Sequence, residues 1–225
     1  MAELNRIISE SLRSDNALME HIVREFLKSK GKQIRPILSI LTGRLFGGNT
    51  DTIIKAAASI ELLHNASLIH DDVIDESAER RGRPTINRTW DNHIAVLVGD
   101  FFVSSALICA VTSGEPRVIQ VMANRARMLS LGEISQLDNT RKHFVSEQSY
   151  YDTIRCKTAA LFCSCVEVGG YAVNADEERL ARIVKYAELF GLCFQIKDDI
   201  FDYYNDPVIG KPTGNDLARA NAHCH

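Results

Sequence analysis

The sequence predicts an all-α protein built as a bundle of long helices, and three observations support this fold class. Apolar residues recur every three or four positions along most of the chain, for example from Leu180 to Phe190, which is the spacing of amphipathic helices. No segment alternates apolar and polar residues over the length of a strand. Glycine and proline, which interrupt helices, are concentrated at a few breaks. The breaks lie at Gly31, Gly47–Gly48, Gly82–Pro84 and Gly210–Pro212.

The helices can be placed in order along the chain. Residues 1–10 have the pattern of an amphipathic helix, and a helix that opens at Asp51 should run to the acidic residues 71–75. Ser113 stands just before a Glu-Pro pair, and Asn174 is followed three positions later by a glutamate. Both patterns are start signals, so two further helices are expected to begin near these residues.

The longest apolar stretch, Ile94–Val111, is long enough to be compared with a membrane span. Asp100 lies in its middle next to Gly99, and a charge at that depth is costly in a bilayer. We therefore predict a buried helix and no transmembrane segment. Five cysteines lie in apolar helical contexts, where a free cysteine packs as a small core residue, as expected in a reducing cytoplasm. They are Cys109, Cys156, Cys163, Cys165 and Cys193.

Length and composition fit a single globular domain over residues 1–225. The 225 residues are 45% hydrophobic and 24% charged, and no linker rich in proline, glycine or serine divides them. The formal net charge of −3 gives no reason to expect a nucleic acid or an anionic membrane as partner. No secretory leader opens the sequence, so we expect a cytoplasmic protein.

Two aspartate clusters carry the chemistry of the chain. The first reads DDVID over Asp71–Asp75, and the second reads DDIFD over Asp198–Asp202. Aspartates three or four positions apart share one face of a helix, where like charges repel unless a cation neutralises them. An all-oxygen site suits Mg²⁺, which takes a few carboxylates together with water and phosphate oxygens.

A single cluster of this kind is as well explained by a solvated acidic surface. The second copy favours the metal site, because it lies in an otherwise apolar helix where unpaired carboxylates are costly. Two such clusters on two helices can face each other across a cavity and hold two or three Mg²⁺ ions around one diphosphate.

Three segments give the chain a family resemblance. The run LLHNASLIHDDVIDESAERRGRPTIN at residues 62–87, GKQIRP at residues 31–36 and FQIKDDIFDYYNDPVIGKPTGND at residues 194–216 resemble the trans-polyprenyl diphosphate synthases. The likeness is strongest to the medium- and long-chain members of octaprenyl diphosphate synthase type. It implies an isoprenoid synthase fold and a cytoplasmic homodimer. It also implies Mg²⁺-dependent, head-to-tail condensation of isopentenyl diphosphate with an allylic diphosphate.

The resemblance assigns the metal to both aspartate clusters. On the first cluster Asp72 would assist its two neighbours, and on the second Asp198 would be the principal ligand. The residues concerned are Asp71, Asp72, Asp75, Asp198, Asp199 and Asp202.

The resemblance also assigns cationic and polar residues to the two diphosphates. Isopentenyl diphosphate would contact Lys32, Arg35, His64 and Arg81. The allylic diphosphate or the nascent cation would contact Arg80, Lys157, Thr158, Gln195 and Lys211.

Each of these residues also has an ordinary structural explanation. An arginine pair after a helix complements its C-terminal dipole, a histidine can be a satisfied core residue, and a lysine can extend to the surface. Position supports two of them. His64 lies two turns before Asp71, and Gln195 lies one turn before Asp198, so each should face its acidic cluster.

Product length is expected to depend on the residues one turn before the first cluster. Ala66 and Ser67 stand there, about 6 to 7.5 Å along the axis from Asp71 at 1.5 Å per residue. In the family, bulky aromatic residues at these places shorten the product. The two small side chains therefore point to a longer product, from hexaprenyl to octaprenyl or beyond.

The resemblance ends near Leu217, and residues 218–225 form an atypical tail. We therefore expect the C-terminal helices of the family to be missing from this chain, which leaves its activity open. One alternative is an inactive or regulatory subunit of a prenyl synthase. Another is a terpene cyclase, but such enzymes usually carry an Asn/Ser/Glu-type second metal motif, and Asp198–Asp202 argues against it.

Overall fold

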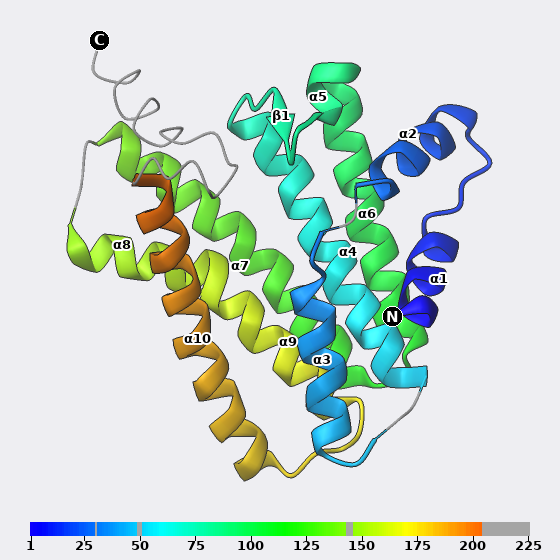
Figure 1. The fold of residues 1–225 in the computed structure, drawn as a ribbon, viewed down its shortest axis with the longest axis vertical. Coiled ribbons are helices and arrows are strands. Elements are labelled where there is room, and N and C mark those ends of the chain that lie inside the picture. Colours follow the sequence, from blue (N-terminus) through cyan, green and yellow to red (C-terminus); the bar gives the residue numbers. More distant parts are fainter. Residues whose placement is uncertain (30, 49–50, 143–145, 204–225) are drawn as a thin grey trace.

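The computed structural model of the chain describes residues 1–29, 31–48, 51–142 and 146–203, and these are helical over most of their length (Figure 1). The all-α prediction is confirmed. The elements are α1 (Ala2–Ser11), α2 (Ala17–Leu27), α3 (Ile34–Leu45), α4 (Asp51–Ile74), β1 (Glu79–Arg80), β2 (Arg83–Pro84), α5 (Ile86–Thr89), α6 (Asn92–Thr112), α7 (Pro116–Arg141), α8 (Glu147–Ile154), the π-helical turn η1 (Arg155–Ala159), α9 (Ala160–Tyr171) and α10 (Glu177–Tyr203).

Helix α4 is the centre of the bundle, with α3 and α6 beside it in Figure 1. Helix α6 packs along α4, α3 packs against α9, and α9 together with η1 packs against α10. Two of these contacts depend on glycine. A Cβ at Gly99 would overlap the His70 ring, and a Cβ at Gly169 would overlap the Ser39 carbonyl oxygen. The helices therefore approach more closely there than any larger residue allows.

The core has two parts. The larger part joins α1, α2, α4, α6, α7 and α9 through fully buried side chains such as Leu62, Phe102 and Met122. The smaller part lies between α9 and α10 around Phe162, whose ring meets the rings of Phe190 and Phe194 at centroid distances of 5.2 and 5.5 Å. Burial of these faces fixes the direction in which α4 and α10 present their acidic ends.

Helix α6 is buried on one face only, so the prediction of a buried helix is correct for its inner side. By length and composition alone it is apolar enough to cross a membrane, yet less than half of its apolar window is buried. Leu97 and Ile108 on its outer side are each 60% exposed. Asp100 is also exposed and lies 3.3 Å from His70 Nε2.

Helix starts follow the expected chemistry, with one correction. Helix α6 is capped by Asp91, whose carboxylate accepts from the Ile94 N–H at 2.8 Å. Helix α10 is capped by Asp176, which accepts from the N–H of Arg179, and not by Asn174. Asn174 has a left-handed backbone with φ of 51° and precedes the cap in the connecting loop.

A short hairpin follows α4, where the sequence indicated only a break. Strands β1 and β2 pair antiparallel, with Arg80 opposite Arg83. The two residues between them, Arg81 and Gly82, have φ of 54° and 70°, as the primed turns of two-residue hairpins require. The hairpin turns the chain back towards the end of α4, so that its arginines lie beside the first acidic cluster.

Candidate active site

The first acidic cluster occupies the C-terminal turn of α4. Asp71 is partly buried, and Asp75 follows one turn later with its N–H bonded to the Asp71 carbonyl at 2.8 Å. Burial raises the pKa of Asp71 to about 6, and the negative charges of Glu133 and Asp75 add to this effect against Lys157 and Arg80. The fold therefore disfavours the ionised form of Asp71, and a bound cation would offset this effect.

Asp72 faces another direction. It is 6% exposed, and its Oδ1 accepts from Arg80 Nε at 2.8 Å. Neighbouring residues point about 100° apart at 3.6 residues per turn, so Asp72 is turned from Asp71 but is three positions from Asp75. Its bond to Arg80 ties the hairpin to α4.

The second acidic cluster lies at the C-terminal end of α10 and belongs to a chain of hydrogen bonds. Asp199 accepts from Gln195 Nε2 at 2.8 Å and from the Tyr150 hydroxyl of α8 at 2.5 Å. Gln195 in turn accepts from the Thr158 hydroxyl of η1 at 2.7 Å. Burial, followed by the bond to Asp199, raises the pKa of Tyr150, so its hydroxyl remains a donor. Asp198 is partly buried beside them.

Two of the expected site residues cannot be placed. The side chain of Asp202 and the whole of Lys211 lie outside the described residues, as does the tail at 218–225.

Lys157 of η1 reaches α7 and acts electrostatically on the first cluster. It forms an ion pair with Glu133 of α7 and donates to Gln136 Oε1 at 3.0 Å. It is partly buried, so it does not simply extend to the surface. Because Glu133 and Lys157 both act on the pKa of Asp71, this pair connects the first cluster electrostatically with η1.

The π-helical turn η1 gives Lys157 and Thr158 different neighbours. Lys157 reaches α7, whereas Thr158 reaches α10. Arg125 of α7, only 4% exposed, donates to the carbonyl of Cys156 inside this turn. A widened turn interrupts the regular helical bonding, and such turns are frequent at functional sites. Arg125 thus supports the part of the backbone that carries both side chains.

Sequence reasoning missed four residues of this region. Glu133 and Gln136 stand one turn apart on α7, Tyr150 is on α8, and Arg125 is buried behind η1. Glu133 and Gln136 share a helix face, but the same spacing occurs on many solvated helices. Tyr150 and Arg125 become visible only when the helices are packed.

A second polar group lies on the α3 side of α4. Arg35 Nη1 lies 3.1 Å from His64 Nε2, and the Arg35 guanidinium lies 5.2 Å from the centre of the Phe162 ring. Burial lowers the pKa of His64 well below its ordinary value, and the charges of Arg35 and Arg81 lower it further. His64 is therefore neutral, and its Nε2 must be the acceptor because arginine has only donors.

Arg35 is itself incompletely satisfied. Its Nε is buried without a hydrogen-bond partner, and burial lowers its pKa. The carboxylate of Glu61 lies near enough to oppose that shift, while Arg81 adds to it. Positive charge thus exceeds the acceptors within reach, which is the condition for binding an anion.

Arg81 and Lys32 complete this group. The Arg81 side chain lies over Gly31, where an added Cβ would come within 2.7 Å of Nη1. The hairpin is therefore in contact with the loop that carries Lys32, which is exposed. The structure brings Arg35, His64 and Arg81 together and places Lys32 next to them in the chain.

The acidic clusters fit a divalent cation that shares its ligands with phosphate. Among the side chains of the described residues, no group of three histidine, cysteine, aspartate or glutamate residues is arranged to hold a metal ion. A complete cage is not required, because Mg²⁺ usually takes one or two carboxylates, with water and phosphate oxygens in the other positions. Burial and the charges of Glu133 and Asp75 raise the pKa of Asp71, so a cation at this end of α4 would favour its ionised form.

Comparison with known proteins gives a consistent result. The family model described as polyprenyl synthetase matches residues 16–223. Octaprenyl diphosphate synthase of Escherichia coli is 35% identical over 96% of this chain and 68% of its own length. Heptaprenyl diphosphate synthase component 2 of Bacillus subtilis is 33% identical over 97% of this chain and 63% of its own length. The chain thus spans about two thirds of the length of these relatives.

Solved structures show the same fold. A decaprenyl diphosphate synthase from Rhodobacter capsulatus superposes with a TM-score of 0.89 at 38% identity, over 96% of this chain and 67% of that one. A polyprenyl synthase from Caulobacter crescentus, complexed with calcium and isoprenyl diphosphate, gives 0.90 at 33% identity, over 96% and 66%.

Proposed function

Because the chain belongs to the polyprenyl synthetase family, we propose that it acts as a Mg²⁺-dependent prenyltransferase. The reaction is head-to-tail condensation of isopentenyl diphosphate with an allylic diphosphate, and the product is a medium- or long-chain all-trans polyprenyl diphosphate. Relatives that make octaprenyl, heptaprenyl and nonaprenyl diphosphates support this substrate class.

One observation carries the proposal. Helices α4 and α10 run in the same direction, and their acidic C-terminal ends lie at the same end of the bundle (Figure 1). Hydrogen bonds run from Asp199 through Gln195 to Thr158 on η1, and Lys157 directly precedes Thr158 in the sequence. Lys157 pairs with Glu133, and both act on Asp71. This is the arrangement that a diphosphate held between two metal-binding helix ends requires.

The site residues form two groups, one for each substrate diphosphate. Asp71 and Asp75 on one side, with Asp198 and Asp199 on the other, would hold Mg²⁺, which when bound stabilises the charge on the leaving diphosphate. Lys157 adds positive charge beside the same diphosphate. The Thr158 and Gln195 oxygens would direct their dipoles towards an allylic cation. Departing diphosphate accepts the proton that is lost after the new C–C bond forms.

The group around Arg35 would hold isopentenyl diphosphate. Arg35, Arg81 and Lys32 supply fixed positive charge, and a neutral His64 orients Arg35 without adding to the charge to be desolvated. The two anions then lie on opposite sides of the end of α4, so that the double bond of one approaches the allylic carbon of the other.

Small side chains before the first cluster support a longer product. Ala66 is fully buried, and the Ser67 hydroxyl donates to the His64 carbonyl at 2.9 Å. Neither side chain is bulky enough to end an apolar channel along α4.

The direct test is an assay of this chain with labelled isopentenyl diphosphate, Mg²⁺ and either farnesyl or geranylgeranyl diphosphate, followed by separation of the products by length. We expect incorporation that stops on chelation and falls at least about a hundredfold in Asp71→Asn, since the aspartate is a metal ligand. Incorporation that survives both changes would show that the reaction does not use this site.

We further propose that the active form is a cytoplasmic homodimer. The exposed apolar face of α6, with Leu97 and Ile108, supports an interface between two copies. A second candidate is a component of a two-chain enzyme, since one relative is described as component 2. Light scattering and the activity assay separate the two. A homodimer has twice the mass of the chain and is active when purified alone, whereas a two-chain enzyme is active only when the other chain is added.

A further inference from the structure

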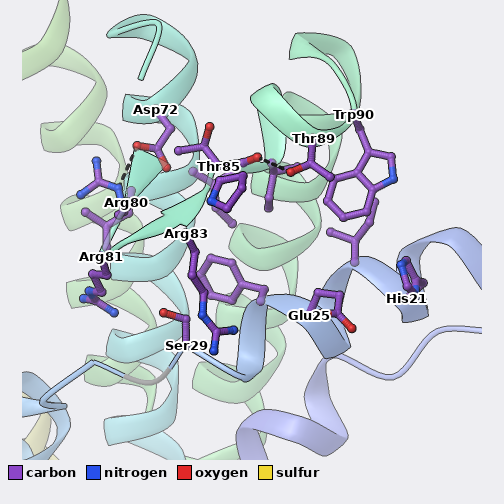
Figure 2. Close-up of a pocket in the computed structure, with 16 residues that line it drawn as sticks. His21, Glu25, Ser29, Asp72, Arg80, Arg81, Arg83, Thr85, Thr89 and Trp90 are labelled. Carbon is purple, nitrogen blue, oxygen red and sulfur yellow. Dashed lines mark hydrogen bonds and ion pairs between the residues drawn. The ribbon is translucent and has the colours of Figure 1, made fainter. Parts of the chain in front are cut away.

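A pocket of about 370 Å³ lies between α2, the end of α4 and the segment from Arg80 to Trp90 (Figure 2). Its lining includes no residue of α7, η1 or α10, which carry the polar network of the candidate active site. The hairpin lies between the two regions and belongs to both, because Asp72, Arg80 and Arg81 also line the pocket. The apolar walls of the pocket and Arg83 have no part in the reaction proposed above.

The walls of the pocket are mainly apolar and well supported. Ile22 and Ile69 are almost completely buried, and the Phe26 ring packs edge-on against Phe102 at 5.1 Å. Trp90 forms another wall, and its indole meets the His21 ring at 6.1 Å in a T-shaped contact. Such a surface favours an apolar body with a flat or extended shape.

The hairpin side of the pocket carries excess positive charge. Two acidic residues line it, but Asp72 is paired with Arg80, and Glu25 is paired with Lys28 at 2.6 Å. The guanidinium groups of Arg81 and Arg83, both labelled in Figure 2, make no hydrogen bond or ion pair within the part of the chain that the structure describes. Two free guanidinium groups are matched better by a doubly charged phosphate than by a carboxylate.

We propose that this pocket binds a small phosphate-headed amphiphile. Its apolar body would lie against Phe26 and Trp90, and its phosphate would lie at Arg83 with Arg81 nearby. The volume is at the lower end of the range for small-molecule sites, so it admits a single short chain or ring system. Binding here requires no turnover.

Trp90 makes the proposal directly measurable, because it is the only tryptophan in the sequence. Octyl phosphate, titrated below its micelle concentration, should change the tryptophan emission of the full chain in a saturable way. Octanoate and octanol should bind at least about tenfold more weakly, because they lack the double charge. Hexyl phosphate should bind about fifteenfold more weakly, at about fourfold per methylene group removed.

Three variants locate the probe. Arg83→Gln should weaken octyl phosphate about tenfold by removing a charge-assisted hydrogen bond. Arg88→Gln, which removes an exposed arginine of α5 that does not line the pocket, should leave the affinity unchanged. Lys32→Gln, in the proposed isopentenyl diphosphate group, should also leave it unchanged. Circular dichroism checks that each variant is folded.

Several outcomes would overturn the proposal. One is the absence of a saturable change in Trp90 emission. Another is octanol binding as tightly as octyl phosphate, which would show a purely apolar surface. A third is loss of affinity in Lys32→Gln but not in Arg83→Gln, which would place the probe in the substrate site.

Discussion

Replacement of Asp71 by asparagine should stabilise the metal-free protein near neutral pH. Folding raises the pKa of this carboxyl from 3.8 to about 6. An acid with a raised pKa holds its proton more tightly in the folded state, so the folded protein loses stability as the pH rises through this interval. At about 1.4 kcal/mol per pKa unit, the cost above pH 6 approaches about 3 kcal/mol. Because solvent still reaches part of the carboxylate, we expect a gain of about 2 kcal/mol in Asp71→Asn.

The assay is urea unfolding of the wild type and the variant in the presence of a chelator. The gain should be full at about pH 8 and should nearly disappear at about pH 3, where the carboxyl is largely protonated in both states. Asp15→Asn, at an exposed aspartate between α1 and α2, is the matched control and should change stability by less than about 0.5 kcal/mol at either pH. A loss of stability in Asp71→Asn at about pH 8, or a gain that does not depend on pH, would refute the reasoning.

Addition of Mg²⁺ with inorganic diphosphate should reverse the order of stability. Wild-type protein gains binding free energy, whereas Asp71→Asn lacks a ligand and gains less. Protons compete with the metal for the same carboxylate, so the wild-type gain should increase as the pH rises through about 6. Equal gains in the two proteins would argue against a metal at Asp71.

Three further predictions concern packing, the π-helical turn and product length. Gly169→Ala should lower the free energy of unfolding by about 2 kcal/mol, because the added Cβ would overlap the backbone of α3. In Gly132→Ala the nearest atoms are 3.8 Å from the added Cβ, so this variant should gain about 0.5 kcal/mol. Equal effects of the two changes would contradict the close approach of α9 to α3. Arg125→Met should speed amide exchange across Arg155–Ala159 and leave α4 protected; unchanged exchange would show that Arg125 does not support the turn. Ala66→Tyr should shorten the products seen by chromatography, and an unchanged product length would remove Ala66 from the channel.

Much of the fold could be predicted because the helices bury stripes of apolar residues at regular spacing. The hairpin at Arg81–Gly82 was not predicted from the sequence, and the reason is physical. Its turn needs positive φ at both central residues, and an arginine at the first gives no such signal, unlike the Asn-Gly or Asp-Gly pairs typical of these turns. The start of α10 was assigned to Asn174 because either residue can cap a helix, and only the backbone conformation distinguishes it from Asp176.

The candidate site was predictable where its residues share one helix. The two turns between His64 and Asp71 and the one turn between Gln195 and the second cluster follow from helical repeat alone. Contacts between helices did not follow. The pairing of Lys157 with Glu133 and the bond from Tyr150 to the second cluster depend on how α7, α8 and η1 pack, and no local pattern encodes that packing.

Asp71 and Asp72 are adjacent, but their replacement is expected to have opposite effects on the stability of the fold. Loss of Asp72 leaves Arg80 as a charge without its partner, so the two positions are expected to change together or not at all. Loss of Asp71 should stabilise the metal-free fold at neutral pH. If Asp71 binds the metal as proposed, a gene copy released from selection for catalysis would accumulate replacements of Asp71 that stabilise the fold. Asp72 would be retained for its bond to Arg80.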